Sequence, residues 1–354
     1  MSRLKYVYTP RRRAARSRER TQARVAIPPL LLAPLLIAVV LGGWWMARDS
    51  GSSESLKEPA VLAASCAPGK TCGATATPAP AAGTGSPRSQ SQFAPAGGAE
   101  PPPITGNSAI VLDEPCGSTL FEQNSHLSVP PASLTKIMTA LVAADHADLN
   151  DMVRIDINGP ELSLETDSTV MGIEPGMTLS MRDLLYGLLL ASGYDAAIQI
   201  AEHVAGTVPA FVRLMNEKAA AMGLTDTHFT NPHGLDDPAL YTSAHDIATL
   251  GRELLGNPDL AEIVRTRAYQ PAWDKPAIEN LNLLLGFYEG AIGVKTGYTD
   301  LAGQTIVAAA ERNGRRIIVS VMGAKTEIYA DASGLLEWAF TETDSTCVPT
   351  RPTP

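Results

Sequence analysis

The stretch GAIGVKTGYTDLAGQTIVAAAERNGRRIIVSVMGA, residues 290–324, decides the fold. Turn residues at 300–303 and 313–315 divide its apolar runs, which predicts three successive strands. Earlier in the chain, SAIVLD at 108–113 and STLFEQN at 118–124 flank the turn sequence EPCG, which predicts a β-hairpin. We expect this hairpin and the three late strands to join in one antiparallel sheet.

The residues between these strands have the periodicity of helices. In SLTKIMTALVAADH, residues 133–146, apolar side chains recur at the spacing of one helix face. The other predicted helices cover 180–192, 195–206, 208–223 and 243–256, and a closing helix is expected over 327–343. The chain should therefore have an α+β fold, in which an antiparallel sheet is flanked by helices and accompanied by a helical subdomain, within one domain over 104–343.

The residues before this domain differ in composition. Residues 1–24 carry nine Lys or Arg and one acid, and residues 25–47 contain no charge, which is long enough to cross a bilayer as a helix. Residues 48–103 are rich in Ala, Pro, Gly, Ser and Thr, so we expect a disordered linker. A basic cytoplasmic tail and a single-pass anchor would place the domain outside the cytoplasm, with 344–354 as a short tail.

Two alternatives to the anchor stay open. A cleaved signal peptide would use VLAASC at 61–66, and a lipid on Cys66 would tether the chain differently. The cleavage site and Cys66 both lie well past the apolar run.

Export permits disulfides, and Cys66 with Cys72 or Cys116 with Cys347 are candidate pairs. The chain has a net charge of −9 although its first 24 residues carry +8, so nucleic acid is not an expected partner.

Ser133 and Lys136 lie three positions apart at the start of the 133–146 helix. Residues at this spacing share a helix face, so the hydroxyl and the amine can meet. Pro130 and Pro131 should give an extended approach to Ser133. A lysine with a depressed pKa can activate a serine as a nucleophile, and a helix N-terminus turns N–H groups towards an oxyanion. The plainer alternative is an N-cap serine with a surface lysine.

Two later patterns are also ambiguous when taken alone. Ser192 and Gly193 lie in a tight turn between two predicted helices, where a serine can face a cleft or merely end a helix. Lys295, Thr296 and Gly297 lie on a predicted strand, where Lys and Thr can bind a carboxylate and Gly lets a substrate lie against the strand. The alternative is a strand that enters a turn.

The three patterns in this order resemble the motif set of penicillin-recognising acyltransferases. From about Ile104 to Thr343 the chain resembles the serine D-alanyl-D-alanine carboxypeptidases, which are low-molecular-mass penicillin-binding proteins. The resemblance extends to PASLTKIMTAL, EPGMTLSMRDLLYGLLLASG and FTNPHGLDDPALYTSAHDIA. It implies a β-lactamase-like fold, peptidoglycan stem peptides as substrates, β-lactams as covalent inhibitors, and no cofactor or metal.

The same resemblance implies a role for each motif residue. Ser133 would be the nucleophile, Lys136 the base, and Ser192 a relay that protonates the leaving group. Lys295 and Thr296 would bind the substrate carboxylate beside Gly297, and the amides of Ser133 and Tyr298 would form the oxyanion hole. The sequence departs from the family at Tyr194, where members usually have asparagine. We therefore expect a slow or altered enzyme, or a penicillin-binding protein with weak activity.

Three rival functions remain. A class A β-lactamase would need a Glu-x-x-Leu-Asn loop, and the chain has only the shorter Glu279-Asn-Leu-Asn282. A zinc peptidase could use the His and Asp residues of HFTNPHGLDD, residues 228–237, although the His-x-x-Glu-His pattern does not accompany them. A non-catalytic wall-binding protein could also keep the fold.

Overall fold

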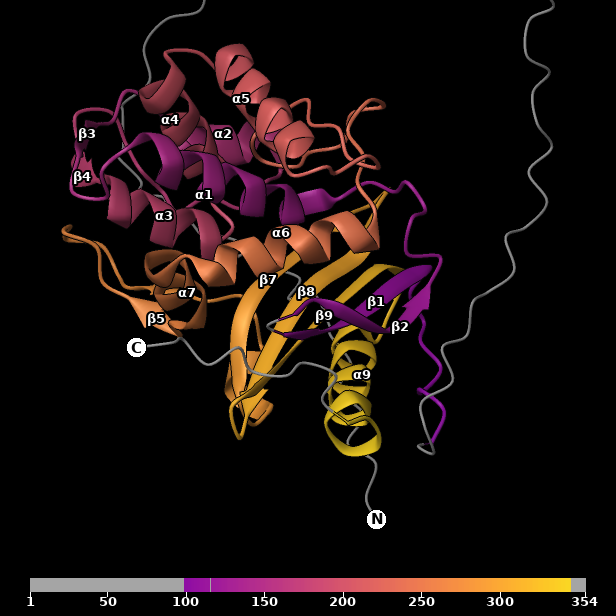
Figure 1. The fold of residues 1–354 in the computed structure, drawn as a ribbon. Coiled ribbons are helices and arrows are strands. Elements are labelled where there is room, and N and C mark those ends of the chain that lie inside the picture. Colours follow the sequence, from indigo (N-terminus) through magenta and orange to yellow (C-terminus); the bar gives the residue numbers. More distant parts are fainter. Residues whose placement is uncertain (1–98, 115, 345–354) are drawn as a thin grey trace, which may run out of the picture. The chain divides into compact units, whose positions relative to one another are not determined.

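A five-stranded antiparallel sheet forms the centre of the domain in the computed structural model, which describes residues 99–114 and 116–344 (Figure 1). The strands lie in the order β2-β1-β9-β8-β7, so the early hairpin pairs with the last strand of the chain. This confirms the predicted sheet. Its strands are β1 (Ser108–Glu114), β2 (Ser118–Gln123), β7 (Ala291–Thr299), β8 (Gly303–Arg312) and β9 (Arg315–Ala324).

Both faces of the central strands β1, β8 and β9 are buried, which explains the long apolar runs in these strands. Ile306 and Ala308 of β8 pack on one side with α9 (Ile328–Glu342), whereas Val307 and Ala309 face the other core. That second core is filled by most of the other helices, with α6 (Ala244–Gly256) directly on β9 and β1. Figure 1 shows α9 on one face and the larger helical part of the domain on the other. The short α8 helix (Leu284–Phe287) contributes Leu284 to the α9 side.

The helical part contains the helices predicted from periodicity. They are α1 (Thr135–His146), α3 (Met181–Leu189), α4 (Tyr194–Ala205) and α5 (Val208–Ala221), in addition to α6 and α9. Each predicted helix is present, with small differences at its ends. The α3 helix begins with a capping box between Ser180 and Asp183, which satisfies two N–H groups that a helix start leaves free.

Several short elements were not predicted. The short helical elements are the 3₁₀ turn η1 (Ala132–Leu134), α2 (Gly159–Thr166), α7 (Pro258–Arg265) and α8 (Leu284–Phe287). Two small two-stranded sheets are also present: β3 (Met152–Arg154) pairs with β4 (Thr178–Ser180), and β5 (Ala268–Tyr269) pairs with β6 (Ile278–Glu279). The α2 and α7 helices each have only eight residues, which is short for a periodic pattern to be recognised.

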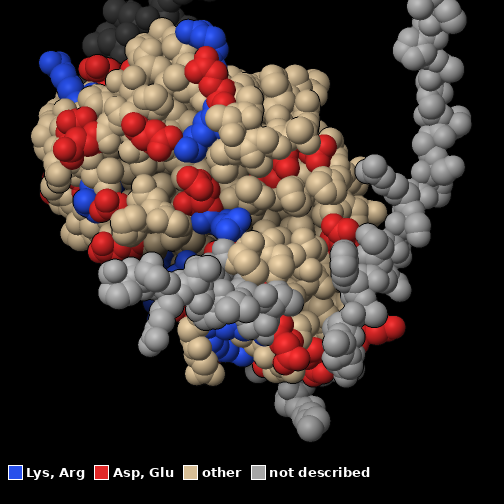
Figure 2. Space-filling model, in the orientation of Figure 1, with Lys and Arg blue, Asp and Glu red and all other residues tan. Residues whose placement is uncertain are grey.

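The predicted basic tail, the predicted anchor and residues 48–98 of the linker predicted over 48–103 lie outside the described residues, as does the tail after 344. Among residues 99–114 and 116–344, no helix is both long and apolar enough to cross a membrane. Cys116 is disulfide-bonded, and the other three cysteines lie outside the described residues. On the face drawn in Figure 2, acidic and basic side chains of the described residues are interspersed rather than gathered by sign.

Candidate active site

Ser133 sits in the 3₁₀ turn η1 that leads directly into α1. The approach is not extended as expected: Pro131 has φ −77° and ψ −22°, in the helical region, and Ala132 has φ +50°. The proline rule restricts the residue before a proline, so it constrains Pro130 but leaves Pro131 free to turn. Thr305 Oγ1 of β8 donates to the Pro131 carbonyl at 3.3 Å, which fixes this turn against the sheet.

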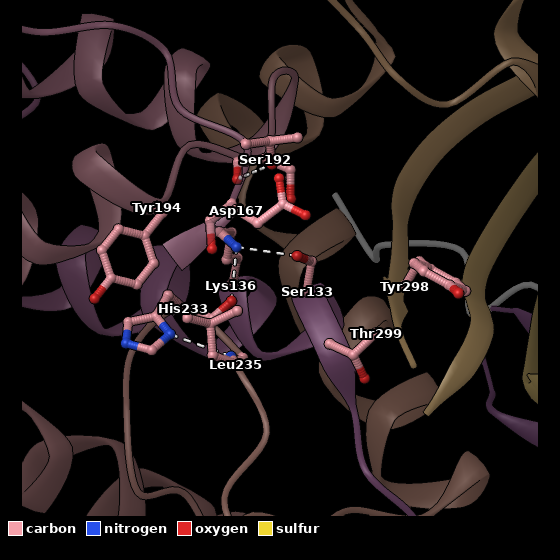
Figure 3. Close-up of a pocket in the computed structure, with 12 residues that line it drawn as sticks. Ser133, Lys136, Asp167, Ser192, Tyr194, His233, Leu235, Tyr298 and Thr299 are labelled. Atoms are coloured by element: carbon pink, nitrogen blue, oxygen red, sulfur yellow. Dashed lines mark hydrogen bonds between the residues drawn. The ribbon is translucent and has the colours of Figure 1, made fainter. Parts of the chain in front are cut away.

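Lys136 lies one turn further along and its amine reaches back to the serine. Lys136 Nζ donates to Ser133 Oγ at 3.0 Å and to the carbonyl of His233 at 2.6 Å (Figure 3). The side chain is only 3% exposed. Burial lowers the pKa of Lys136 well below its ordinary value, Lys295 lowers it further, and the carboxylate of Asp195 acts in the opposite direction. A buried amine with a depressed pKa, in contact with a hydroxyl, can act as a base.

Ser192 occupies the turn between α3 and α4, as the sequence predicted. Its φ of +60° is unusual for a residue with a side chain and indicates a constrained turn. Thr169 holds this turn, because its hydroxyl donates to the Ser192 carbonyl at 3.0 Å and its carbonyl accepts from the Tyr194 N–H at 2.8 Å. Ser192 Oγ is buried, and it has no hydrogen-bond partner within the described part of the chain.

Asp195 anchors the loop that carries Thr169, a contact that sequence reasoning missed. Its fully buried carboxylate accepts N–H groups from Met171 at 2.8 Å, Gly172 at 2.8 Å, Ile173 at 3.0 Å and its neighbour Ala196 at 2.9 Å. These hydrogen bonds tie the start of α4 to the 167–173 loop. The position of Ser192 is therefore fixed from both sides.

Strand β7 brings Lys295, Thr296 and Gly297 next to η1. Lys295 is 2% exposed, its Nζ donates to the Thr296 carbonyl at 2.9 Å, and burial lowers its pKa to about 7. A side-chain carbon on Gly297 would lie 2.9 Å from the backbone nitrogen of Ser133. The close approach that requires glycine here is thus between β7 and the serine turn of the same chain, whereas the sequence suggested contact with a substrate.

A pocket opens in front of Ser133 and Lys136 (Figure 3). Ser192, Tyr194 and Tyr298 also line it, so five of the predicted site residues meet there, while Lys295, Thr296 and Gly297 are not among its lining residues. Sequence reasoning missed several lining residues, which come from the 167–169 loop, the 233–235 loop and the end of β7: Asp167, Ser168, Thr169, Gly234, Leu235 and Thr299. The 167–169 loop shows no helical or strand periodicity, and the 233–235 loop drew attention only for its possible zinc ligands and its family resemblance.

Tyr194 and His233 form one wall of the pocket. Their ring centroids lie 4.3 Å apart, with the planes tilted by 44°. His233 Nδ1 accepts the N–H of Leu235 at 3.1 Å, and burial together with the neighbouring Lys136 lowers the pKa of His233 to about 3. The imidazole is therefore neutral at physiological pH. Burial raises the pKa of Tyr194, and Glu165 adds to this effect.

The histidines and aspartates of 228–237 take structural roles rather than converging. His228 Nδ1 lies 2.8 Å from the Ala239 carbonyl, and Asp236 accepts the Thr299 hydroxyl at 2.8 Å. Within residues 99–114 and 116–344, no group of three or more His, Cys, Asp or Glu is arranged to hold a metal ion. The zinc-peptidase hypothesis thus gains no support from this loop.

Comparison with known families identifies one match. The model of the D-alanyl-D-alanine carboxypeptidase peptidases matches residues 96–326, which include all the pocket residues named above. The matched segment contains the serine-lysine pair, the Ser192 turn and the Lys295 strand in the order that the sequence predicted.

Individual proteins give the same result. A D-alanyl-D-alanine carboxypeptidase of Mycobacterium tuberculosis is 38% identical over 256 residues, which cover 70% of this chain and 86% of that protein. Other curated carboxypeptidases of this name are longer, and the chain spans 62% of two of them. Penicillin binding protein 6B of Escherichia coli has a TM-score of 0.66 at 32% identity, with coverage of 70% and 81%. A DD-transpeptidase of Streptomyces has a TM-score of 0.66 at 28% identity, with coverage of 68% and 99%.

Proposed function

Because the chain belongs to the D-alanyl-D-alanine carboxypeptidase family, we propose that it removes the terminal D-alanine of peptidoglycan stem peptides through an acyl-enzyme on Ser133. One observation carries this assignment: the amine of a buried lysine lies 3.0 Å from the hydroxyl of a serine at the mouth of a pocket. The sequence motifs supplied both residues, and the structure supports the contact that the chemistry needs.

In the acylation step, Ser133 Oγ attacks the carbonyl of the penultimate D-alanine while Lys136 takes the hydroxyl proton. The tetrahedral intermediate places negative charge on the former carbonyl oxygen, and the amides of Ser133 and Tyr298 stabilise it. The C–N bond then breaks, and the leaving D-alanine receives a proton from Lys136 through Ser192. The buried Ser192 hydroxyl suits this relay, because no hydrogen bond to the described residues holds it elsewhere.

Lys295 and Thr296, which lie on β7 beside the serine turn but do not line the pocket, would bind the terminal carboxylate of the substrate. Lys295 has a pKa of about 7 because it is buried. A bound carboxylate favours the charged amine, so substrate binding would raise this pKa and strengthen the contact. The positive charge would also keep the pKa of Lys136 low, since Lys295 is the second cause of that depression.

Water completes the cycle by hydrolysing the ester on Ser133, with the oxygen of water joined to the acyl carbon and the proton returned to the serine. Transfer of the same acyl group to an amine would be a transpeptidase reaction, as in the name of the Streptomyces relative. A β-lactam would acylate Ser133 in the same way. The opened β-lactam stays bound to Ser133 as an ester, and slow hydrolysis of this ester makes the β-lactam a covalent inhibitor.

A second function is a penicillin-binding protein with weak peptidase activity, and Tyr194 is the observation that favours it. An asparagine at this position could offer an amide donor and a carbonyl acceptor, whereas tyrosine offers one hydroxyl. Loss of one preorganised donor reduces the rate about 100- to 1,000-fold in other acyl-transfer sites. Acylation of Ser133 would persist, because the Lys136 contact remains.

We also place the domain outside the cytoplasm, tethered to the membrane. The support is the uncharged stretch 25–47 behind a basic segment, together with a substrate that lies in the cell wall.

A β-lactamase, the less favoured enzyme, would show rapid and repeated hydrolysis of β-lactams.

The experiment measures D-alanine release from a diacyl-D-Ala-D-Ala peptide by the exported domain. We expect slow release by the native protein and none by Ser133→Ala or Lys136→Ala, each checked for an unchanged unfolding temperature. Release that continues in Ser133→Ala but stops with a chelator would support a metal peptidase and contradict the proposal.

A further inference from the structure

Tyr194 faces the pocket with its ring and not with its hydroxyl. It is the first residue of α4, and its ring lies 4.3 Å from the imidazole of His233, centroid to centroid. In Figure 3 the Tyr194 hydroxyl points away from Ser133. A hydroxyl in that direction cannot take over the contacts of the family asparagine beside the nucleophile. Any contribution of Tyr194 to the reaction must therefore come through the ring and what it touches.

The ring touches the residue that holds the catalytic amine. The His233 carbonyl accepts Lys136 Nζ at 2.6 Å, the shorter of the two hydrogen bonds of that amine. The imidazole is fixed by the Leu235 N–H on its Nδ1, and the backbone of the loop is fixed because the Gly234 α-carbon packs tightly against the Ala132 carbonyl. The tyrosine ring packs against this imidazole, and both residues line the pocket.

We propose that Tyr194 is a positioning residue for the acylation reaction, which acts by packing its ring on His233 so that the His233 carbonyl stays on Lys136 and water stays away from the amine. The inference rests on the proposed function of Ser133 and Lys136 as the acylating pair. In this chain a packing contact would do part of what an asparagine side chain does in related enzymes. The tyrosine hydroxyl would be dispensable.

The effect on Lys136 has a definite sign. The charged groups that face this amine are Lys295 from β7 and Asp195 from α4, with Asp167 and the neutral His233 at the pocket. Burial is the largest cause of the lowered pKa of Lys136. Removal of the tyrosine ring would admit water, reduce the desolvation and raise that pKa. A smaller fraction of Lys136 would then be the neutral base at a given pH, so acylation would slow.

The test compares Tyr194→Phe, which keeps the ring, with Tyr194→Ala and Tyr194→Leu, which remove it. Asparagine is unsuitable here because it would add an amide of its own. The first readout is the titration midpoint of Lys136, measured by NMR on protein with labelled lysine side chains. The Lys136 signal is assigned by its loss in Lys136→Arg. The second is the pH profile of acylation by a β-lactam, which should rise with pH as Lys136 loses its proton.

We expect the Phe variant to match the native protein in both readouts. In the Ala and Leu variants the Lys136 midpoint and the rising limb of the acylation profile should move together to higher pH. Below both midpoints, a shift of one pH unit slows acylation about tenfold. An unchanged midpoint in folded Ala and Leu variants would overturn the proposal, as would a Phe variant that behaves like them.

The NMR readout needs no reaction, so it separates this inference from the proposed function. A native protein that is never acylated, but whose Lys136 midpoint shifts in the Ala and Leu variants, would refute the enzyme assignment and keep the packing role. Unfolding temperatures of all variants identify any that fail to fold, and the Leu variant retains an apolar side chain for that reason.

Discussion

Gly297→Ala should damage the reaction more than it damages the fold. A side-chain carbon at this position would lie 2.6 Å from Thr305 Oγ1, 2.9 Å from the backbone nitrogen of Ser133 and 3.1 Å from the side chain of Ala132. The Thr305 side chain can rotate away only by giving up its hydrogen bond to the Pro131 carbonyl, and the Ser133 nitrogen belongs to the turn that carries the nucleophile. Strand β7 and η1 must therefore separate to accommodate the added methyl group.

The size of each effect follows from this geometry. Overpacking in a well-packed interior costs about 1–3 kcal/mol of folding free energy. A displacement between the Ser133 and Tyr298 amides would remove one of the two proposed oxyanion donors, and that loss slows related reactions about 100- to 1,000-fold. We therefore predict a folded protein with a modestly lower unfolding free energy and a much larger loss of acylation rate.

Gly251→Ala provides the matched control. In α6, a side-chain carbon at Gly251 would lie 2.6 Å from Val307 Cγ1 of β8, an equally close contact that is not with the serine turn. This variant should lose a comparable 1–3 kcal/mol or so of stability and keep its acylation rate. Gly256→Ala, whose added methyl group would meet no atom outside its own helix turn within 4 Å, should keep the acylation rate and change the unfolding free energy by no more than about 1 kcal/mol.

The assay is the second-order rate of acylation by a fluorescent penicillin, with unfolding by urea measured on the same samples. Equal acylation rates in the Gly297 and Gly251 variants would contradict this prediction, because they would show that the contact between β7 and the serine turn does not organise the site. A Gly297 variant that fails to fold would also contradict the predicted magnitude.

Three further predictions follow from the buried charges and the uncharged N-terminal stretch. Lys295 has a pKa of about 7 in the folded protein and about 10.4 in the unfolded chain, so between these pH values the unfolded chain binds more protons. The unfolding free energy of the native protein should therefore rise relative to that of Lys295→Met as the pH increases from 7 towards 10. Parallel curves of unfolding free energy against pH for the two proteins would argue against this prediction. Asp195→Asn should lower the unfolding free energy by about 2–4 kcal/mol, because an amide group cannot accept hydrogen bonds from all the N–H groups that bind this carboxylate. A loss below about 1 kcal/mol in urea unfolding would count against Asp195 as the anchor of the 167–173 loop. Epitope tags before residue 20 and after residue 345 should lie on opposite sides of the membrane, and a membrane-free protein that begins near residue 64 would instead show cleavage.

The sheet and the long helices could be predicted from the sequence because their signals are local. Strand β9 begins and ends where the pattern placed it, since its residues are buried on both faces and the turns beside it are rich in glycine and polar residues. The α7 helix was missed although Asn257 caps it, Pro258 occupies its first position and Asp259 lies in its first turn. These start signals were present, but eight residues were too few for the periodicity to stand out.

The candidate site was only partly predictable for a different physical reason. Ser133 and Lys136 share a helix face, so their contact follows from spacing alone. The His233 carbonyl reaches Lys136 across 97 residues and belongs to the backbone, so no side-chain type marks it. The αR conformation of Pro131 was likewise set by tertiary contact, since Thr305 on a distant strand binds its carbonyl.

The central claim is that Lys136 makes Ser133 an acylating nucleophile, and intact-protein mass spectrometry after incubation with a β-lactam tests it most directly. We predict a mass increase equal to one β-lactam molecule, which maps to the peptide that contains Ser133, is absent from Ser133→Ala and is strongly reduced in Lys136→Ala. An unchanged mass at saturating β-lactam, or an adduct that persists in Ser133→Ala, would contradict it.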